Sequence, residues 1–137
     1  MMQRRMNGAV VMECSVLIVD DSPILRMAIR KVAVMAGVDP ERIREAGNGA
    51  EALERLEEQP SDLVLLDINM PVMDGEQFVE ALQERPHLQD TLIVVVSTES
   101  NRERLSRLEA LGVRESLHKP FEPEALAEII GRRLGVE

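Results

Sequence analysis

Short apolar runs alternate with longer amphipathic stretches from Ser15 to Leu134. This alternation is typical of parallel strands joined by covering helices, because each parallel crossover needs a long connection that packs back on the sheet. The pattern predicts five strands, at residues 15–19, 42–46, 63–66, 92–96 and 115–118. Three of them are nearly all apolar, which indicates strands that are buried on both faces of a sheet.

Five helices are predicted to follow these strands. The first begins at Pro23, after Asp21 and Ser22 as possible caps, and Gly37 ends it. Its apolar residues recur at helical spacing and are expected to face the sheet. The other four helices are predicted from a cap at Asn48 to Glu58, at 76–84, from 100 or 101 to 111 before Gly112, and at 123–134.

Right-handed crossovers between these elements predict a doubly wound α/β fold, a parallel sheet with helices on both faces. A chain of 137 residues fits one compact domain, which is expected at residues 14–137. Residues 1–13 lack clear periodicity and are predicted to be a flexible extension. Part of this extension is alternatively a start-site artefact, since Met2, Met6 and Met12 could each begin the chain.

The charge of the chain argues against direct binding of nucleic acid. The formal net charge of −9 repels a phosphate backbone. One basic cluster, Arg102, Arg104 and Arg107, is interleaved with Glu103 and Glu109, so we interpret it as a solvated helix face.

A cytoplasmic location without membrane insertion is expected. The single cysteine, Cys14, excludes an internal disulfide and is compatible with a reducing compartment. No apolar run approaches the roughly 20 residues that span a bilayer.

Polar side chains that carry chemistry follow the predicted strands. Asp20 and Asp21 come after the first strand, Asp67 after the third, Ser97 after the fourth and Lys119 after the fifth. These strand ends meet at one edge of a doubly wound sheet. Three carboxylates in one place are stable mainly with a cation, and Mg²⁺ suits oxygen ligands that leave room for phosphate.

This set of residues predicts phosphoryl transfer onto an aspartate. Asp67 stands alone and is the candidate phosphoacceptor. Lys119 would place a positive charge against the phosphoryl oxygens, and the Ser97 hydroxyl would donate a hydrogen bond to one of them.

Four motifs resemble the receiver domain of two-component response regulators: Asp20-Asp21, LLDINMPVMDG around Asp67, Ser97-Thr98 and Lys119-Pro120-Phe121. The resemblance covers about residues 15 to 134 and is greatest to stand-alone chemotaxis receivers of the CheY type. It implies a flavodoxin-like sheet of strand order 2-1-3-4-5. The implied activity is that of a signalling domain rather than an enzyme.

The resemblance also implies the roles of individual residues. Asp21 and Asp67 would bind Mg²⁺ directly, Asp20 through water and Asn69 through its backbone carbonyl. The Lys119–Pro120 peptide would be cis. The side chains of Asn69 and Glu99 would tune the lifetime of the phosphoryl group, which we expect to be on the short side of the family's range.

The switch residues depart from the family's pattern. Ser97, Thr98 and Ser116 occupy the switch positions, and Ser116 stands where the family commonly has Tyr or Phe. No aromatic side chain can therefore rotate inward at this position, and the output face of the fourth helix, the fifth strand and the fifth helix is expected to work differently.

The predicted partners are a histidine kinase or a phosphotransfer domain as donor, and a downstream protein target. The resemblance makes chemotaxis the leading pathway. Two alternatives stay open at this point. One is a magnesium-dependent phosphatase or phosphotransferase with an aspartyl-phosphate intermediate, which would turn over a small substrate. The other is an inactive receiver that serves as a binding scaffold.

Overall fold

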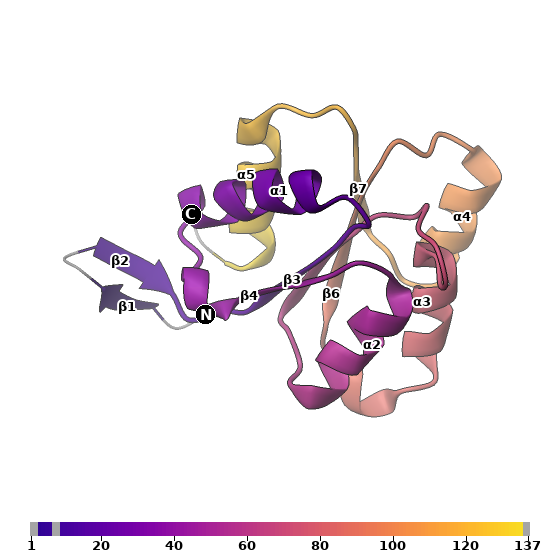
Figure 1. Ribbon diagram of the computed structural model, residues 1–137, viewed down its shortest axis with the longest axis horizontal. Helices are drawn as coiled ribbons and strands as arrows, with labels where there is room; N and C mark the ends of the chain where they lie inside the picture. The colour runs from indigo at the N-terminus through magenta and orange to yellow at the C-terminus, as the bar shows by residue number, and fades with distance from the viewer. Residues whose placement is uncertain (1–2, 7–8, 136–137) are drawn as a thin grey trace.

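A five-stranded parallel sheet forms the centre of the computed structural model, which describes residues 3–6 and 9–135 (Figure 1). The sheet order is β4-β3-β5-β6-β7. Counting the parallel strands alone, this is the predicted order 2-1-3-4-5, so the doubly wound fold is confirmed. The strands are β3 (Val16–Val19), β4 (Ile43–Ala46), β5 (Leu63–Leu66), β6 (Leu92–Ser97) and β7 (Glu115–His118).

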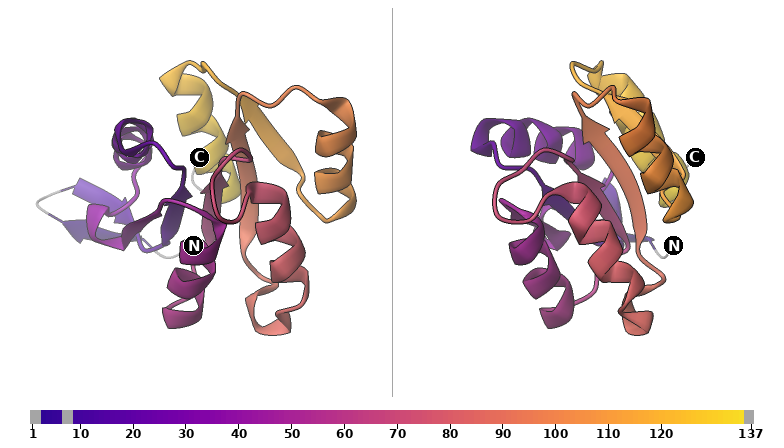
Figure 2. Two further views of the ribbon diagram at one scale, coloured as in Figure 1. Left: turned by 45° about the vertical axis from the view of Figure 1, so that its right-hand side comes forward. Right: turned by 90° about the vertical axis from the view of Figure 1, so that its right-hand side faces the viewer.

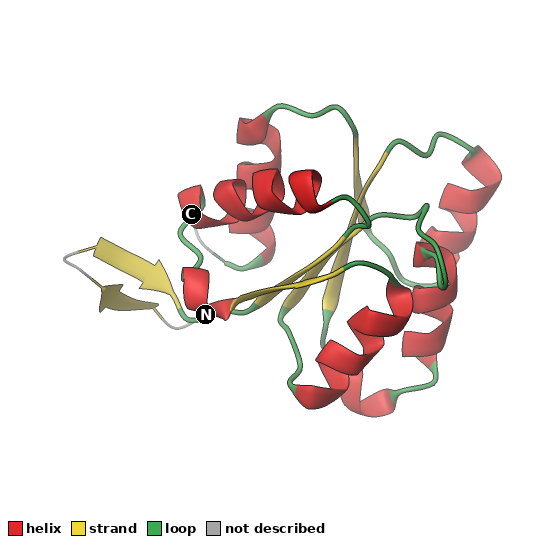
Figure 3. Cartoon of the chain, in the orientation of Figure 1, coloured by secondary structure: helices red, strands yellow, loops and turns green. Residues whose placement is uncertain are grey.

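In the residues that the structure describes, five α-helices cover the two faces of the sheet (Figures 2 and 3). On one face lie α1 (Pro23–Met35) and α5 (Pro123–Arg133), and on the other lie α2 (Gly49–Glu58), α3 (Gly75–Gln83) and α4 (Arg102–Ala110). Two short 3₁₀ helices, η1 (Pro40–Arg42) and η2 (Pro86–Leu88), precede β4 and β6. No helix in the described part of the chain is long and apolar enough to cross a membrane.

Side-chain caps explain where four of the helices begin. Ser22, Asn48, Asp74 and Asn101 each accept a hydrogen bond from a backbone N–H in the first turn of α1, α2, α3 and α4. Asp74 forms a full capping box with Gln77, which places the start of α3 at Gly75, one residue before the predicted start.

Side chains along each strand point alternately to the two faces of the sheet, and this divides the interior into two cores. Val16 and Ile18 of β3 face α1 and α5, whereas Leu17 and Val19 face α2, α3 and α4. All four residues of β3 and of β5 are buried. The carboxyl ends of these two central strands are therefore fixed from both sides of the sheet.

A regular element that the sequence analysis missed lies in the predicted N-terminal extension. Strands β1 (Gln3–Met6) and β2 (Ala9–Met12) pair in antiparallel fashion and form a sheet separate from the central one. Pairing of the N–H and C=O groups that face the partner strand does not require an apolar periodicity, which is why the pattern did not predict it. Cys14 is buried and lies just before β3, outside any strand.

Candidate functional site

An acidic cluster lies at the carboxyl ends of β3 and β5. Oxygen atoms of Asp20, Asp21 and Asp67 lie within 4.8 Å of one another. Asp20 and Asp67 are 1% and 7% exposed, whereas Asp21 is open to solvent. Backbone hydrogen bonds to the neighbouring strands hold the two buried residues, because Asp20 N donates to Ala46 O (3.1 Å) and Asp67 N to Val19 O (2.9 Å).

Lys119 reaches this cluster from the end of β7. Its backbone N–H donates to Ser97 O over 2.9 Å, and the peptide to Pro120 is cis, as the resemblance implies. The Nζ atom lies 2.7 Å from Asp20 Oδ2 and 3.6 Å from Asp67 Oδ2. The Lys119 side chain is 10% exposed, so these contacts are little screened by water.

Asp67 lies in an environment with opposing electrostatic effects. Burial raises the pKa of its carboxyl group above the ordinary value, the Lys119 ammonium opposes that rise, and the Asp20 carboxylate adds to it. Hydrogen bonding from the Ser97 side chain and from the Ile68 N–H (2.8 Å to Asp67 Oδ1) also favours the charged form. The carboxylate is thus kept close to its partners but poorly hydrated.

The donor set of the cluster suits a small, hard cation. Three carboxylates supply only oxygen ligands, and the Lys119 ammonium balances one of their charges. Oxygen-only sites with few protein carboxylates are typical of Mg²⁺, which retains several waters. A divalent cation at these residues would compete with Lys119 for Asp20, because the ammonium already contacts Asp20 Oδ2.

A second polar network lies beside the cluster, and sequence reasoning missed its central residue. Asn69 Nδ2 is 3.5 Å from Glu99 Oε1, and Arg104 Nη1 donates to Asn69 Oδ1 (2.7 Å) and to Glu99 Oε1 (2.8 Å). The interpretation of the Arg102, Arg104 and Arg107 cluster as a solvated helix face is therefore wrong for Arg104, whose side chain is only 22% exposed. Its acidic partners come from other elements, which a pattern along one helix does not reveal.

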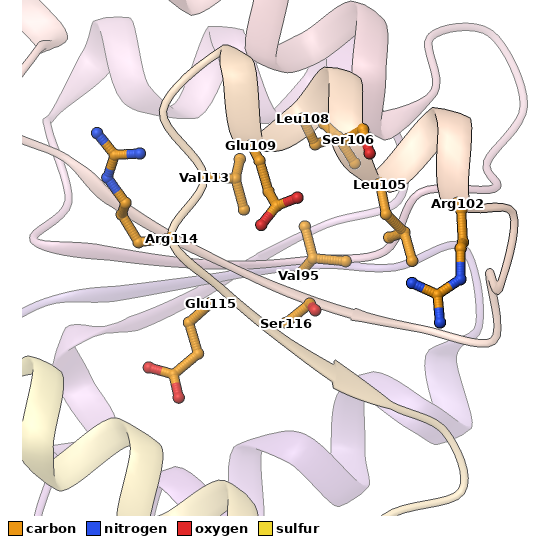
Figure 4. Close-up of a pocket in the computed structure, with 10 residues that line it drawn as sticks. All are labelled: Val95, Arg102, Leu105, Ser106, Leu108, Glu109, Val113, Arg114, Glu115 and Ser116. Carbon is orange, nitrogen blue, oxygen red and sulfur yellow. The ribbon is translucent and has the colours of Figure 1, made fainter.

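The switch position on β7 borders a cavity of about 250 Å³ between α4 and the sheet (Figure 4). Ser116 is exposed and pairs in register with Val95 of β6, two residues before Ser97. The apolar part of the lining consists of Val95, Leu105, Leu108 and Val113, and the polar part of Arg102, Ser106, Glu109, Arg114, Glu115 and Ser116. Of the predicted site residues, Ser116 is thus placed apart from the acidic cluster, and Thr98 is exposed at the end of β6.

The structure brings the other predicted site residues together. Asp20, Asp21, Asp67 and Lys119 form one charged group, and Ser97 adjoins it through the backbone contact with Lys119. Carboxylates, a hydroxyl group and a lysine at the carboxyl ends of the strands of a doubly wound sheet are the arrangement that the sequence motifs predicted for a receiver domain.

The chain belongs to the response regulator receiver domain family, whose sequence model matches residues 16–131. It is 34% identical over 120 residues to the chemotaxis protein CheY of Bacillus subtilis, covering 87% of this chain and 96% of that protein. The solved structure of the chemotaxis response regulator CheY4 of Vibrio cholerae is 33% identical with a TM-score of 0.79, covering 89% of this chain and 99% of that one. A third relative is the histidine kinase BarA of Escherichia coli, 30% identical over 86% of this chain but only 12% of the kinase.

Proposed function

We propose that this chain accepts a phosphoryl group on Asp67 and uses it to switch its affinity for a protein partner. The observation that supports this most strongly is the position of Asp67 between two other carboxylates and the Lys119 ammonium. A nearly buried carboxylate held beside a cation is poised as a nucleophile, because positioning and charge neutralisation supply most of the catalysis in phosphoryl transfer.

The chemistry of the proposed transfer uses few groups. An Asp67 carboxylate oxygen attacks the phosphorus of a phosphohistidine or of acetyl phosphate, and a P–O bond forms. The bond from phosphorus to the donor's nitrogen or oxygen breaks, and its electron pair leaves with the donor. Later attack by water breaks the bond between Asp67 and phosphorus and releases inorganic phosphate, so no oxidant or reductant is required.

The residues around Asp67 have separate roles in this proposal. Asp20, Asp21, Asp67 and the Asn69 carbonyl would hold Mg²⁺, which when bound neutralises charge on the phosphoryl oxygens. Lys119 would leave Asp20 and contact a phosphoryl oxygen, since its Nζ atom is already 3.6 Å from Asp67 Oδ2. The buried Ser97 hydroxyl accepts a hydrogen bond from Glu99 N (3.1 Å), and its own proton, which interacts with the Asp67 carboxylate in this structure, would turn to the phosphoryl group.

The proposed phosphoryl donor is a histidine kinase or a phosphotransfer domain. Apolar side chains on the outer surface of α1 are unusually exposed, with Ile24 at 79%, Met27 at 56% and Met35 at 70%. This surface begins at Ile24, three residues after Asp21 of the acidic cluster, and suits a transient protein contact. Relatives named as chemotaxis proteins make chemotaxis the leading pathway, and the buried thiol of Cys14 is compatible with a cytoplasmic location.

The proposal is tested by intact mass after incubation with acetyl phosphate and Mg²⁺. We expect one phosphoryl adduct on the wild-type chain, its loss when Mg²⁺ is chelated, and no adduct on Asp67→Asn. Asp90→Asn is a matched control because Asp90 is exposed and lies before β6, at the opposite edge of the sheet. An adduct that persists on Asp67→Asn, or its absence from the wild type, would overturn the proposal, whereas continuous release of phosphate from a small phosphate monoester, in place of the acetyl phosphate donor, would favour a phosphatase.

A further inference from the structure

Arg104 connects three elements around the candidate phosphorylation site. It lies in the first turn of α4, where the Asn101 cap accepts a hydrogen bond from its backbone N–H. Its guanidinium contacts Asp74 Oδ2 (3.3 Å) and Glu76 Oε1 (3.5 Å) at the start of α3. The same group donates to Asn69 Oδ1 and Glu99 Oε1, at 2.7 and 2.8 Å.

The two inner partners of Arg104 lie directly outside the buried site. Asn69 follows Asp67 by two residues beyond the end of β5, and Glu99 follows Ser97 by two residues beyond the end of β6. Asp67 and Ser97 are buried, whereas Asn69 is exposed and Glu99 is partly exposed. The contact between the Asn69 and Glu99 side chains therefore connects the two strand ends on the solvent side of Asp67.

We propose that Arg104 is a positioning residue that holds Asn69 and Glu99 as a bridge across the opening above Asp67, and so slows the access of water to the phosphoryl group. This inference rests on the proposed function and deepens it. The bridge on its own is one contact at 3.5 Å, near the limit for a hydrogen bond. Two shorter contacts from a single guanidinium nitrogen strengthen it on both sides.

The other contacts of Arg104 fix the guanidinium in place. Asp74 and Glu76 hold its Nη2 and Nε atoms, so the planar fork cannot turn without breaking ion pairs to α3. The backbone N–H of Asn101 also donates to Glu99 Oε2 over 3.0 Å, which keeps the Glu99 carboxylate turned toward α4. A lysine at position 104 would keep the charge but could not make these directed contacts at once.

The test compares loss of the phosphoryl group from Arg104→Ala and from the wild-type chain. Each protein is phosphorylated with acetyl phosphate and Mg²⁺, the donor is removed, and the fraction carrying the adduct is followed by timed intact-mass measurement. We expect the rate of loss to rise about fivefold in Arg104→Ala, which corresponds to about 1 kcal/mol of barrier. Arg104→Lys should show most of the same acceleration.

Arg107→Ala is the matched control. Arg107 lies one turn further along α4 and pairs with Glu76 at 2.8 Å, but its ion pair does not include Asn69 or Glu99. Its removal should leave the rate unchanged. The second control introduces Arg104→Ala into a chain that carries Asn69→Ala and Glu99→Ala, where the bridge is already absent and Arg104 should have no further effect.

Three results would overturn the inference. These are an unchanged or slower loss in Arg104→Ala, an equal acceleration in Arg107→Ala, and a full effect of Arg104→Ala without the bridge side chains. A wild-type chain that forms no adduct refutes the proposed function and this inference together. A wild-type adduct whose lifetime is independent of Arg104 refutes the inference alone.

Discussion

Gly75 is the position at which we expect one added methyl group to disturb both the fold and the site. It begins α3, and its N–H donates to Ile68 O over 2.8 Å. A Cβ atom there would lie 2.6 Å from Asp67 O and 2.8 Å from Ile68 Cα. Both atoms belong to the backbone that carries the candidate phosphoacceptor, so the clash cannot be relieved by turning a side chain.

The magnitude of the Gly75→Ala effect follows from two opposing contributions. Overpacking a buried site costs about 1–3 kcal/mol, and the upper part of that range applies because the contacts are with backbone. Alanine favours a helix over glycine by up to about 1 kcal/mol, which offsets part of the cost. We therefore expect a net loss of about 2 kcal/mol, which lowers the urea midpoint by about 1 M for an m-value of about 2 kcal/mol/M.

The assay is urea unfolding followed by circular dichroism at the helix band, because the chain has no tryptophan or tyrosine for fluorescence. Gly47→Ala is the control, since its added Cβ would lie no closer than 3.7 Å to its nearest neighbour, an Arg26 side-chain atom. That variant should unfold within about 0.3 M of the wild type, as substitutions without a strong structural effect do. Equal midpoints for Gly75→Ala and the wild type would refute the steric argument.

Three further changes should have defined effects. Val72→Asn should raise the free energy of unfolding by about 0.5–1 kcal/mol in urea titrations, because Val72 has a φ of 69° and asparagine tolerates that left-handed backbone better. Lys119→Met should lower the free energy of unfolding by about 3 kcal/mol when Mg²⁺ is absent, because it leaves the buried Asp20 and Asp67 carboxylates without their cation. Added Mg²⁺ should then stabilise this variant by more than it stabilises the wild type. Burial, with a smaller contribution from Asp62, raises the pKa of the Cys14 thiol from 9.0 to about 11. The contribution of the protonated thiol to folding stability should therefore be complete below pH 9 and be lost as the pH rises toward 11. Urea midpoints across that pH range measure this loss.

Each of these predictions has a control. Val34→Asn changes an exposed valine inside α1 and should not stabilise the chain, so equal gains at both positions would contradict the backbone argument. A loss in Lys119→Met that Mg²⁺ does not reduce would contradict the competition for Asp20. Cys14→Ala should remove the alkaline fall in stability that is due to the thiol, and an unchanged fall would assign it to other groups.

Most of the fold could be predicted from the sequence because local signals and burial agree. Residues 63–66 and 115–118 are strands with the predicted bounds. Asn48 caps α2 as predicted, because its short polar side chain satisfies a free N–H in the first turn. The β1–β2 hairpin was missed, although Asn7-Gly8, which lies outside the described residues, is a dipeptide typical of short hairpin loops.

The site was predictable where strand ends alone determine it. Asp67 and Lys119 are brought to one edge by the topology of the sheet, so their positions in sequence are sufficient. The contacts of Arg104 with Asn69 and Asp74 were not predictable, because they depend on how α4 packs beside α3 and on side-chain directions across 35 and 30 positions of sequence. Roles at Asn69, Glu99 and Ser116 stay predictions until the phosphoryl chemistry is measured.

The cavity beside Ser116 makes this chain convenient for spectroscopy. Its volume of about 250 Å³ between α4 and β7 offers room for an aromatic ring at a position where the wild type has a hydroxyl group. Because the chain has no tryptophan or tyrosine, Ser116→Trp would introduce its only indole. The emission of that single fluorophore would report the gap between α4 and the sheet without a background signal, so any movement of α4 that accompanies phosphorylation could be followed in real time.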